Sequence, residues 1–317
     1  MRIKKDKNGY YSLMGDKVNG KEETLESFKK NKPIRYIPIL LQGDVMEMLQ
    51  HVPDNSIDLV VADPPYNIGV KYGTSFNDTK PFMDYIEWCK QWLTLSFTKL
   101  KEGGSLFLIN YPEASAYLKV LVLDKLFNYR KTITWCYESM IGLSPKNFTT
   151  ASRQILYYTK GNNFTFNKED IVIPYVNLND KRIQERIKMG SKGKAPYDYW
   201  FFNLVKNVSK DKIDNTCDNS GPSNQIPKNL IERIIKVSTN RGDTVLSLFA
   251  GTGTDLEVCC NLDVCRRCIG IELNPDFCNG IKTRLKETLN KKITNLDTIK
   301  SDGNVLGFLE KRDFLKL

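Results

Sequence analysis

The sequence predicts an α/β protein built on a doubly wound, mostly parallel sheet of the Rossmann-like type. Three observations support this fold. Short buried strands alternate with amphipathic helices, the strand expected at 244–248 runs into a glycine turn, and the strand expected at 56–62 ends at an aspartate. Such alternation packs helices on both faces of a parallel sheet, and ligands bind beyond the carboxyl ends of its strands. A chain of 317 residues can bury the core that this fold needs.

The first part of the chain supplies alternating strands and helices. An apolar stretch from Ile37 ends in a turn at Asp44, and a short helix is expected over 45–49. Short apolar runs rich in β-branched residues predict buried strands, and apolar residues at helical spacing predict helices. The strands expected here cover 56–62, 105–109, 130–137 and 153–159, and the helices cover 82–100 and 114–127.

A change of character between 163 and 220 interrupts this pattern. Regular alternation fades, basic residues gather and aromatic residues follow them, so we interpret the segment as an insertion. Its basic residues are Lys181, Arg182, Arg186, Lys188, Lys192 and Lys194. Order then returns, with helices expected at 228–238, 254–260 and 275–289 and strands at 244–248 and 268–272.

Composition narrows the class of partner and compartment. The net charge of +10 suits a polyanion, because cationic side chains release counterions from phosphates; a lysine-rich protein with no nucleic-acid role is the alternative. Apolar runs are too short to span a bilayer. The basic N-terminal segment is followed by no apolar signal core, so we expect a cytoplasmic protein without a membrane partner.

The glycine turn after 244–248 predicts a nucleoside site. Gly251 and Gly253 let the backbone approach a ligand closely, and the N–H groups that open the next helix suit a carboxylate or phosphate. Glu272 ends the following strand, where its carboxylate can accept both hydroxyls of a ribose. An ordinary tight turn beside a surface acid is the alternative. The cofactor contacts expected here are Phe249, Ala250, Gly251, Thr252, Gly253, Thr254 and Glu272.

The segment Asp63-Pro64-Pro65-Tyr66 predicts a clamp for an amino group, and these four residues are the expected catalytic set. The prolines fix φ and remove two backbone donors, which leaves the Pro64 carbonyl rigidly aimed. A carboxylate and a carbonyl can then accept both hydrogens of an exocyclic amine and localise its lone pair for attack. Tyr66 is expected to stack on the base, and a plain turn is the alternative.

Several other chemistries are disfavoured. The turn lacks the third glycine of a dinucleotide site and the Lys-Ser/Thr pair of a phosphate-binding loop. A single histidine, His51, allows no histidine triad or multi-histidine metal site. The cysteines from Cys259 to Cys268 lack two separated CxxC pairs, so no metal is predicted. Without a Pro-Cys dipeptide, covalent attack on a cytosine ring carbon is not supported.

The clamp segment precedes the glycine turn, and this order resembles that in the beta class, the circularly permuted class, of S-adenosylmethionine-dependent DNA amino-methyltransferases. The resemblance extends from about residue 38 to residue 289. The resemblance implies S-adenosyl-L-methionine as cofactor and a base flipped out of double-stranded DNA as substrate. It also implies cofactor contacts from Asp44, Asp63 and the loop around Ile226. The insertion would be the target-recognition region, and its basic residues would contact DNA.

The resemblance divides the chain into an N-terminal extension (1–36), a catalytic half (37–162), a target-recognition region (163–221), a cofactor-binding half (222–290) and a C-terminal tail (291–317). Some residues depart from the family pattern. Ser247-Leu248 stand where an Asp-Pro pair is frequent, Ile226 replaces a usual lysine, and Arg153-Gln154 replace a usual His-Glu pair. These departures concern cofactor affinity and the base pocket.

Adenine N6 is the expected methyl acceptor, because Asp63 in the clamp resembles the adenine enzymes. Cytosine N4 is the alternative within the class. RNA guanine-N2 methyltransferases use a similar clamp, but in the unpermuted order. A DNA-binding specificity subunit without catalysis is the alternative from another class, and the intact motifs argue against it. A restriction endonuclease would be a separate chain, and the sequence does not settle whether the protein dimerises.

Overall fold

The computed structural model describes residues 2–5, 11–14, 36–69, 71–72, 76–77, 79–138, 146–205, 225–261, 263–288 and 298–300. The chain divides into two compact units, Met1–Ile34 and Arg35–Leu317. In the first unit, β1 (Arg2–Lys5) pairs antiparallel with β2 (Tyr11–Met14). Most of the predicted N-terminal extension and C-terminal tail lies outside the described residues, as do residues 206–224 around the end of the predicted recognition region.

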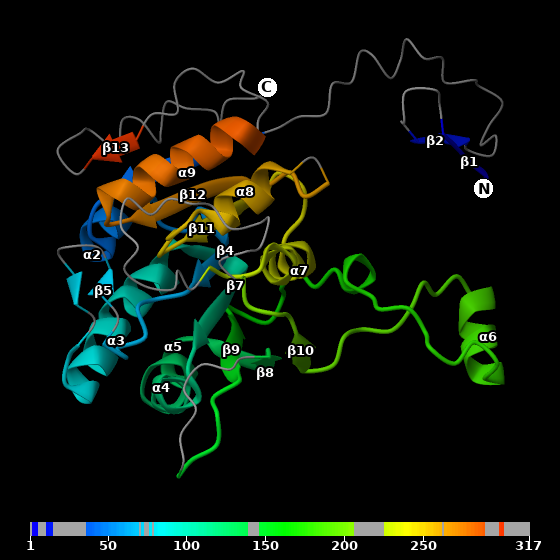
Figure 1. The fold of residues 1–317 in the computed structure, drawn as a ribbon, viewed down its shortest axis with the longest axis horizontal. Coiled ribbons are helices and arrows are strands. Elements are labelled where there is room, and N and C mark those ends of the chain that lie inside the picture. The colour runs from blue at the N-terminus through cyan, green and yellow to red at the C-terminus, as the bar shows by residue number, and fades with distance from the viewer. Residues whose placement is uncertain are drawn as a thin grey trace. The chain divides into compact units, whose positions relative to one another are not determined.

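The second unit is built on a mixed, mostly parallel sheet with the strand order β10-β8-β9-β7-β4-β11-β12-β3-β13 (Figure 1). Only β9 runs antiparallel to its neighbours, β7 and β8. The predicted doubly wound α/β class is therefore confirmed. The strands are β3 (Ile39–Gln42), β4 (Ile57–Ala62), β7 (Leu100–Asn110), β8 (Asn128–Cys136), β9 (Ser152–Thr159), β10 (Tyr199–Phe201), β11 (Thr244–Ser247), β12 (Arg267–Glu272) and β13 (Thr298–Lys300).

Helices cover both faces of the sheet and bury two hydrophobic clusters. Side chains alternate along a strand, so Phe107 and Ile109 of β7 enter one cluster while Leu106 and Leu108 enter the other. The first cluster packs under α7 (Lys228–Ser238), α8 (Thr254–Cys260) and α9 (Pro275–Thr288). The second packs under α2 (Val45–Met48), η1 (Leu49–His51), α3 (Phe82–Lys99), α4 (Pro112–Leu118) and the π-turn η2 (Lys119–Leu123), which leads into α5 (Asp124–Leu126).

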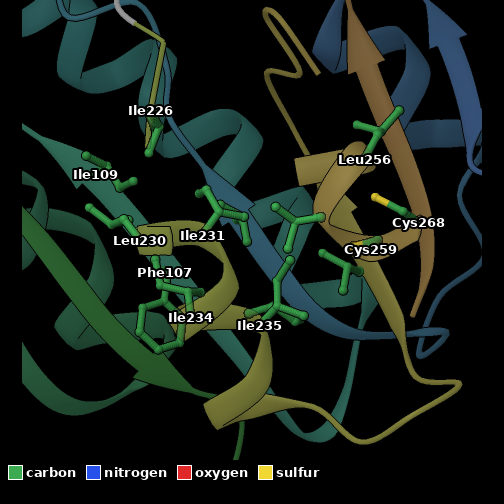
Figure 2. Packing of buried hydrophobic residues seen from close by; sticks show 14 of the residues in the cluster. Phe107, Ile109, Ile226, Leu230, Ile231, Ile234, Ile235, Leu256, Cys259 and Cys268 are labelled. Carbon is green, nitrogen blue, oxygen red and sulfur yellow. The ribbon is translucent and has the colours of Figure 1, made fainter. Parts of the chain in front are cut away.

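Helix α7 shows why the first face is stable. Four of its apolar side chains, Leu230, Ile231, Ile234 and Ile235, recur at helical spacing and are fully buried. Figure 2 shows them facing β7 and the side chains of α8. Burying each such side chain contributes about 1.5–3 kcal/mol. This burial fixes α7 against the sheet and α8.

The observed helices and strands agree in part with those that the local sequence pattern predicts. Helices α7 and α8 have the predicted bounds. Strand β7 starts earlier than expected, because Leu100 pairs with Ile57 of β4 before the chain reaches its two glycines. The helix expected at 114–127 is divided by η2. Short elements were not predicted, namely the hairpin of β5 (Lys71–Tyr72) with β6 (Phe76–Asn77), η3 (Lys168–Asp170), α6 (Lys181–Lys188), β10 and β13.

Two further observations concern membrane-spanning helices and a possible metal site at the cysteines. In the described part of the chain, no helix combines the length and apolar character needed to cross a bilayer. Cys259, Cys260, Cys265 and Cys268 are buried free thiols. Among the described residues, no three histidine, cysteine or acidic side chains come together as a metal site.

Candidate active site

The carboxyl ends of four neighbouring parallel strands carry the predicted site. Asp63 follows β4, the glycine turn follows β11, Glu272 ends β12 and Asp44 lies just beyond β3. Backbone hydrogen bonds join neighbouring strand ends: Leu248 N donates to the Val61 carbonyl at 3.1 Å, and Gly43 N donates to the Glu272 carbonyl at 3.0 Å. The two motifs, distant in sequence, are therefore neighbours at one edge of the sheet.

The glycine turn is held by the acid that the sequence paired with it. Glu272 Oε2 accepts from Gly251 N at 2.7 Å, and Oε1 accepts from Asn274 N at 2.8 Å. Burial raises the pKa of Glu272 to about 7 although these amides favour the charged form. Each carboxylate oxygen keeps a second lone pair for a ligand hydroxyl.

Space beside the turn fits a ligand at Gly251. Gly251 has φ +51°, and apart from the glycine and its two chain neighbours, no atom of the described residues lies within 4 Å of the position that a Cβ would take there. Gly253 has φ +79°, and its missing Cβ would lie 2.8 Å from Ile281 Cγ1. The first glycine thus leaves open space, whereas the second allows α9 to pack closely against the turn.

The remaining predicted cofactor residues surround this turn. Asp44 caps α2, with Oδ1 accepting from Met46 N at 2.8 Å, and is otherwise exposed. Phe249 is half-buried against Trp88 and Trp92, whose ring centroids lie 5.8 and 5.3 Å away. Ile226 is buried directly before α7. Thr252 and Thr254 flank Gly253, and Ala250 N donates to the Ile271 carbonyl at 2.8 Å.

In the clamp segment, Tyr66 makes contacts within the protein that differ from the expected stacking on a base. Its ring is 5% exposed and packs edge-on against Tyr111, with centroids 5.1 Å apart. Its hydroxyl donates a short hydrogen bond to Asp63 Oδ1. The partly exposed ring of Tyr111 is an aromatic surface beside the clamp that sequence reasoning missed. Asn67 anchors the clamp loop, because its amide exchanges two hydrogen bonds with the backbone of Lys80.

Asp63 as a residue is partly exposed, but its carboxyl group is enclosed by protein. The pKa of Asp63 is raised to about 7, because burial and the negative charge of Asp255 outweigh the opposing effects of nearby groups. The Arg153 guanidinium and the Tyr66 hydroxyl act in the opposite direction. The carboxyl is therefore poised near neutrality, as groups that take part in proton and amine chemistry often are.

Two partners of the site were not assigned a role from the sequence. Arg153 is 1% exposed, and its Nη1 donates to Tyr66 Oη at 3.0 Å. Asp255 is buried under the turn, where its Oδ2 accepts from Ser247 Oγ at 2.5 Å. Both Arg153 and Ser247 stand out in the sequence as departures from the family pattern. Their contacts could not be read there.

The predicted DNA-binding residues lie on and after α6. Lys181, Arg182, Arg186 and Lys188 are exposed on this helix, which Asp180 caps by accepting from Arg182 N at 2.8 Å. Lys192 is exposed in the following loop. Lys194 Nζ donates to Tyr197 Oη at 2.7 Å and lies 4.3 Å from the centre of that ring. The exposed basic side chains of this helix suit a polyanion, although Arg182 is paired with Asp180 at 3.2 Å.

Comparison with known proteins identifies the family. A family model described as DNA methylase, of the N6/N4 methyltransferases, matches residues 57–283. The chain belongs to the N6/N4 DNA methylase family. The matched range includes both motifs and the elements from β4 to most of α9, and leaves out the sheet strands β3 and β13.

Curated relatives of this N6/N4 methylase are type II and related methyltransferases. It is 33% identical over 284 residues to type II methyltransferase M.BamHI of Bacillus amyloliquefaciens, covering 86% of this chain and 63% of that one. It is 30% identical over 243 residues to DNA adenine methyltransferase YhdJ of Escherichia coli (strain K12), covering 75% of this chain and 79% of the relative. The chain thus spans less than two thirds of the first relative's length.

Solved structures show the same fold at low identity. The cytosine-N4-specific PvuII DNA methyltransferase superimposes with a TM-score of 0.57 at 15% identity, covering 86% of this chain and 99% of that one. The M1.HpyAVI–SAM complex gives a TM-score of 0.53 at 20% identity, covering 78% and 99%. The N6/N4 methylase therefore has the Rossmann-like methyltransferase fold.

Proposed function

We propose that this protein transfers a methyl group from S-adenosyl-L-methionine to the exocyclic N6 of an adenine flipped out of double-stranded DNA. The single observation that carries the proposal is the adjacency of Asp63 and the glycine turn at the ends of β4 and β11. These parallel strands pair Val61 with Ser247, two residues before one motif and two before the other. An amine held by the clamp would then lie next to a nucleoside cofactor held by the turn.

The residues present suit this cofactor. Its sulfonium and ammonium groups are cationic, and three carboxyl groups lie at the two motifs: those of the buried Asp255 and Glu272 and that of the partly exposed Asp63. The open space beside Gly251 admits a ligand at the backbone. Asp44 and Glu272 would hold the adenosine part through its polar edges, and Ile226, Phe249, Ala250, Thr252, Gly253 and Thr254 would complete the contacts.

The cofactor supplies, when bound, an electrophilic methyl group on a sulfonium. The protein has to make a weak aromatic amine into a nucleophile. Asp63 and the Pro64 carbonyl would accept hydrogen bonds from the two N–H groups of the amine, so that the lone pair of the amine nitrogen is directed at the methyl carbon. The new N–C bond forms as the S–C bond breaks, with the bonding pair going to sulfur. Ionised Asp63 stabilises the positive charge that develops on nitrogen and can take the released proton.

The choice of adenine rests on the chemistry of the clamp and on one relative. Asp63 resembles the clamp of adenine enzymes, and the Escherichia coli relative bears the name DNA adenine methyltransferase. Cytosine N4 presents the same exocyclic amine and is the competing target. Relatives named type II methyltransferases further suggest a modification enzyme whose restriction endonuclease is a separate chain.

The decisive experiment incubates the protein with labelled S-adenosylmethionine and unmethylated genomic DNA, and then analyses the digested nucleosides by mass spectrometry. N6-methyladenine supports the proposal in full. N4-methylcytosine would retain the mechanism but overturn the target base. Cofactor binding without any methylated nucleoside would overturn DNA as the acceptor, and RNA is then tested in the same assay.

Variants of Asp63 test the clamp itself. Asp63→Ala removes the acceptor, so the turnover number should fall by about 10²–10³-fold, the range seen when a preorganised polar contact to the transition state is lost. Cofactor binding, measured by calorimetry, should persist within about tenfold. Asp54→Ala is the control, because Asp54 pairs with Lys99 away from the strand ends. Undiminished turnover in Asp63→Ala contradicts the clamp mechanism.

A further inference from the structure

A buried arginine lies directly behind the clamp. Arg153 belongs to β9, pairs in register with Trp135 of β8 and is 1% exposed. Its Nη1 donates to the Tyr66 hydroxyl at 3.0 Å, and that hydroxyl donates to Asp63 Oδ1. The three groups form a continuous chain from guanidinium to hydroxyl to carboxylate. Because Arg153 is so deeply buried, it acts on the clamp from behind and has no access to DNA.

Aromatic rings enclose the guanidinium. Its central carbon lies 4.7 Å from the ring centre of Tyr66, 5.1 Å from Trp135, 5.5 Å from Tyr111 and 5.8 Å from Tyr137. Such rings stabilise a cation through their negative faces but cannot neutralise it. Asp63 is the carboxylate whose charge favours the protonated arginine. A buried cation is costly unless an anion compensates it, so Arg153 and Asp63 are electrostatically linked through Tyr66.

The direction of these hydrogen bonds is dictated by chemistry. A guanidinium has donors only, whereas a tyrosine hydroxyl has one proton and two lone pairs. Arg153 therefore occupies a lone pair of Tyr66, and the single hydroxyl proton is left to point at Asp63 Oδ1. This arrangement uses one carboxylate oxygen and leaves the other for an incoming amine.

We propose that Arg153 is a positioning residue of the clamp, which orients the Tyr66 proton toward Asp63 and favours the ionised form of the Asp63 carboxyl that accepts the amine of the target base. This inference rests on the proposed methyl transfer for its purpose, although the charge coupling itself does not. Where the family usually has histidine, this chain would thus hold a permanent cation that does not titrate near neutrality.

The groups around Asp63 make the coupling measurable. Burial and Asp255 on α8 raise the pKa of Asp63, whereas Arg153 on β9 and Tyr66 in the clamp loop lower it. The balance leaves the carboxyl titrating at about pH 7. Removal of a cation at this range should raise its pKa by about 1–2 units, within the span seen for neighbouring opposite charges. Asp63 would then be mostly protonated at pH 7.

The first test needs no turnover. The carboxyl carbon of Asp63 is titrated by ¹³C NMR in the cofactor-free protein, with Asp63→Asn used to assign the signal. In Arg153→Met the midpoint should move up by about 1–2 pH units, while Arg153→Lys, which keeps the charge, should stay nearer to the wild type. Arg266→Met is the matched control, since Arg266 is also buried but bonds Thr239 and Val264 at the other end of the sheet. An unmoved midpoint in Arg153→Met overturns the proposal.

The second test uses the reaction. The acid limb of the pH profile of kcat/KM reports the free enzyme, so in Arg153→Met it should shift upward with the midpoint. The loss should be about 5–50-fold at pH 7 and largely recovered at pH 9. A loss that is equal at every pH indicates a structural role and overturns the proposal. If Arg153→Met does not fold, Tyr66→Phe interrupts the same chain and should raise the limb as well. Full activity of Asp63→Ala would instead refute the methyl-transfer clamp, while the NMR midpoint still decides the coupling.

Discussion

The hydroxyl of Ser247 donates a 2.5 Å hydrogen bond to Oδ2 of Asp255, joining the end of β11 to the first turn of α8 across the glycine turn. Both side chains are buried. Ser247 stands at a position where the family that this sequence resembles often has aspartate. In this chain α8 therefore contributes the acidic group beside the turn. Burial raises the pKa of Asp255 to about 6, and the Ser247 hydroxyl opposes that rise.

Ser247→Ala should destabilise the turn. The substitution leaves a buried carboxyl oxygen without its donor, which costs about 1–3 kcal/mol of the free energy of unfolding. Urea denaturation at pH 7.5 measures the loss. Ser238→Ala is the matched control, because the buried Ser238 hydroxyl bonds only a carbonyl of its own helix, that of Ile234. Similar small losses in both variants would show that the Ser247–Asp255 bond is unimportant.

Stability of the cofactor-free protein should fall as the pH rises from about 4 to about 7. Asp63 and Glu272 titrate near 7 and Asp255 near 6 in the folded state, against ordinary values of 3.8 to 4.5. In this window the native state keeps protons that the unfolded chain has released, so the free energy of unfolding decreases with pH. Asp54 and Asp124 have lowered pKa values and titrate below the window.

Urea denaturation at half-unit steps of pH measures this slope. Asp255→Asn should flatten the profile near pH 6, since it removes one of the acidic groups whose pKa is raised in the folded state. A free energy of unfolding that increases between pH 4 and 7 would contradict the prediction.

Glu272→Gln should weaken cofactor binding. The amide can replace only one of the two acceptors that bond Gly251 N and Asn274 N, and it removes a negative charge beside the turn. We expect the dissociation constant to rise at least about tenfold, equivalent to about 1.4 kcal/mol. Calorimetric titration with S-adenosylmethionine measures it. Glu232→Gln on α7, which removes an ion pair with Lys236, should bind the cofactor normally.

Neutralising α6 should reduce DNA affinity and its dependence on salt. Replacing Lys181, Arg182, Arg186 and Lys188 by alanine should lower the slope of log K against log salt by about 0.9 for each side chain that contacts a phosphate. Fluorescence anisotropy at several salt concentrations measures the slope. Lys90→Ala on α3, where Lys90 pairs with Glu87, is a control for the loss of an exposed charge. An unchanged slope would place the DNA surface elsewhere.

Local sequence determined the fold class, most elements and the two motifs. The apolar runs that form β4 and β11, the helical spacing of α7 and the glycines of the turn each depend on neighbouring residues, so their consequences are readable along the chain. The motifs lie at strand ends because a strand–turn–helix unit encodes its own geometry. Short elements such as β10 escaped, because three residues with one buried side chain, Trp200, show no period.

Only the tertiary structure decided which distant side chains meet. Arg153 reaches Tyr66, 87 residues away, because β9 runs antiparallel beside β7 and therefore begins next to the clamp. The Tyr66 hydroxyl in turn donates to Asp63 Oδ1. Because hydrogen bonds and burial depend on positions in space, strand order and direction decide which groups surround the Asp63 carboxyl, whereas its identity and its place at a strand end were already present in the sequence.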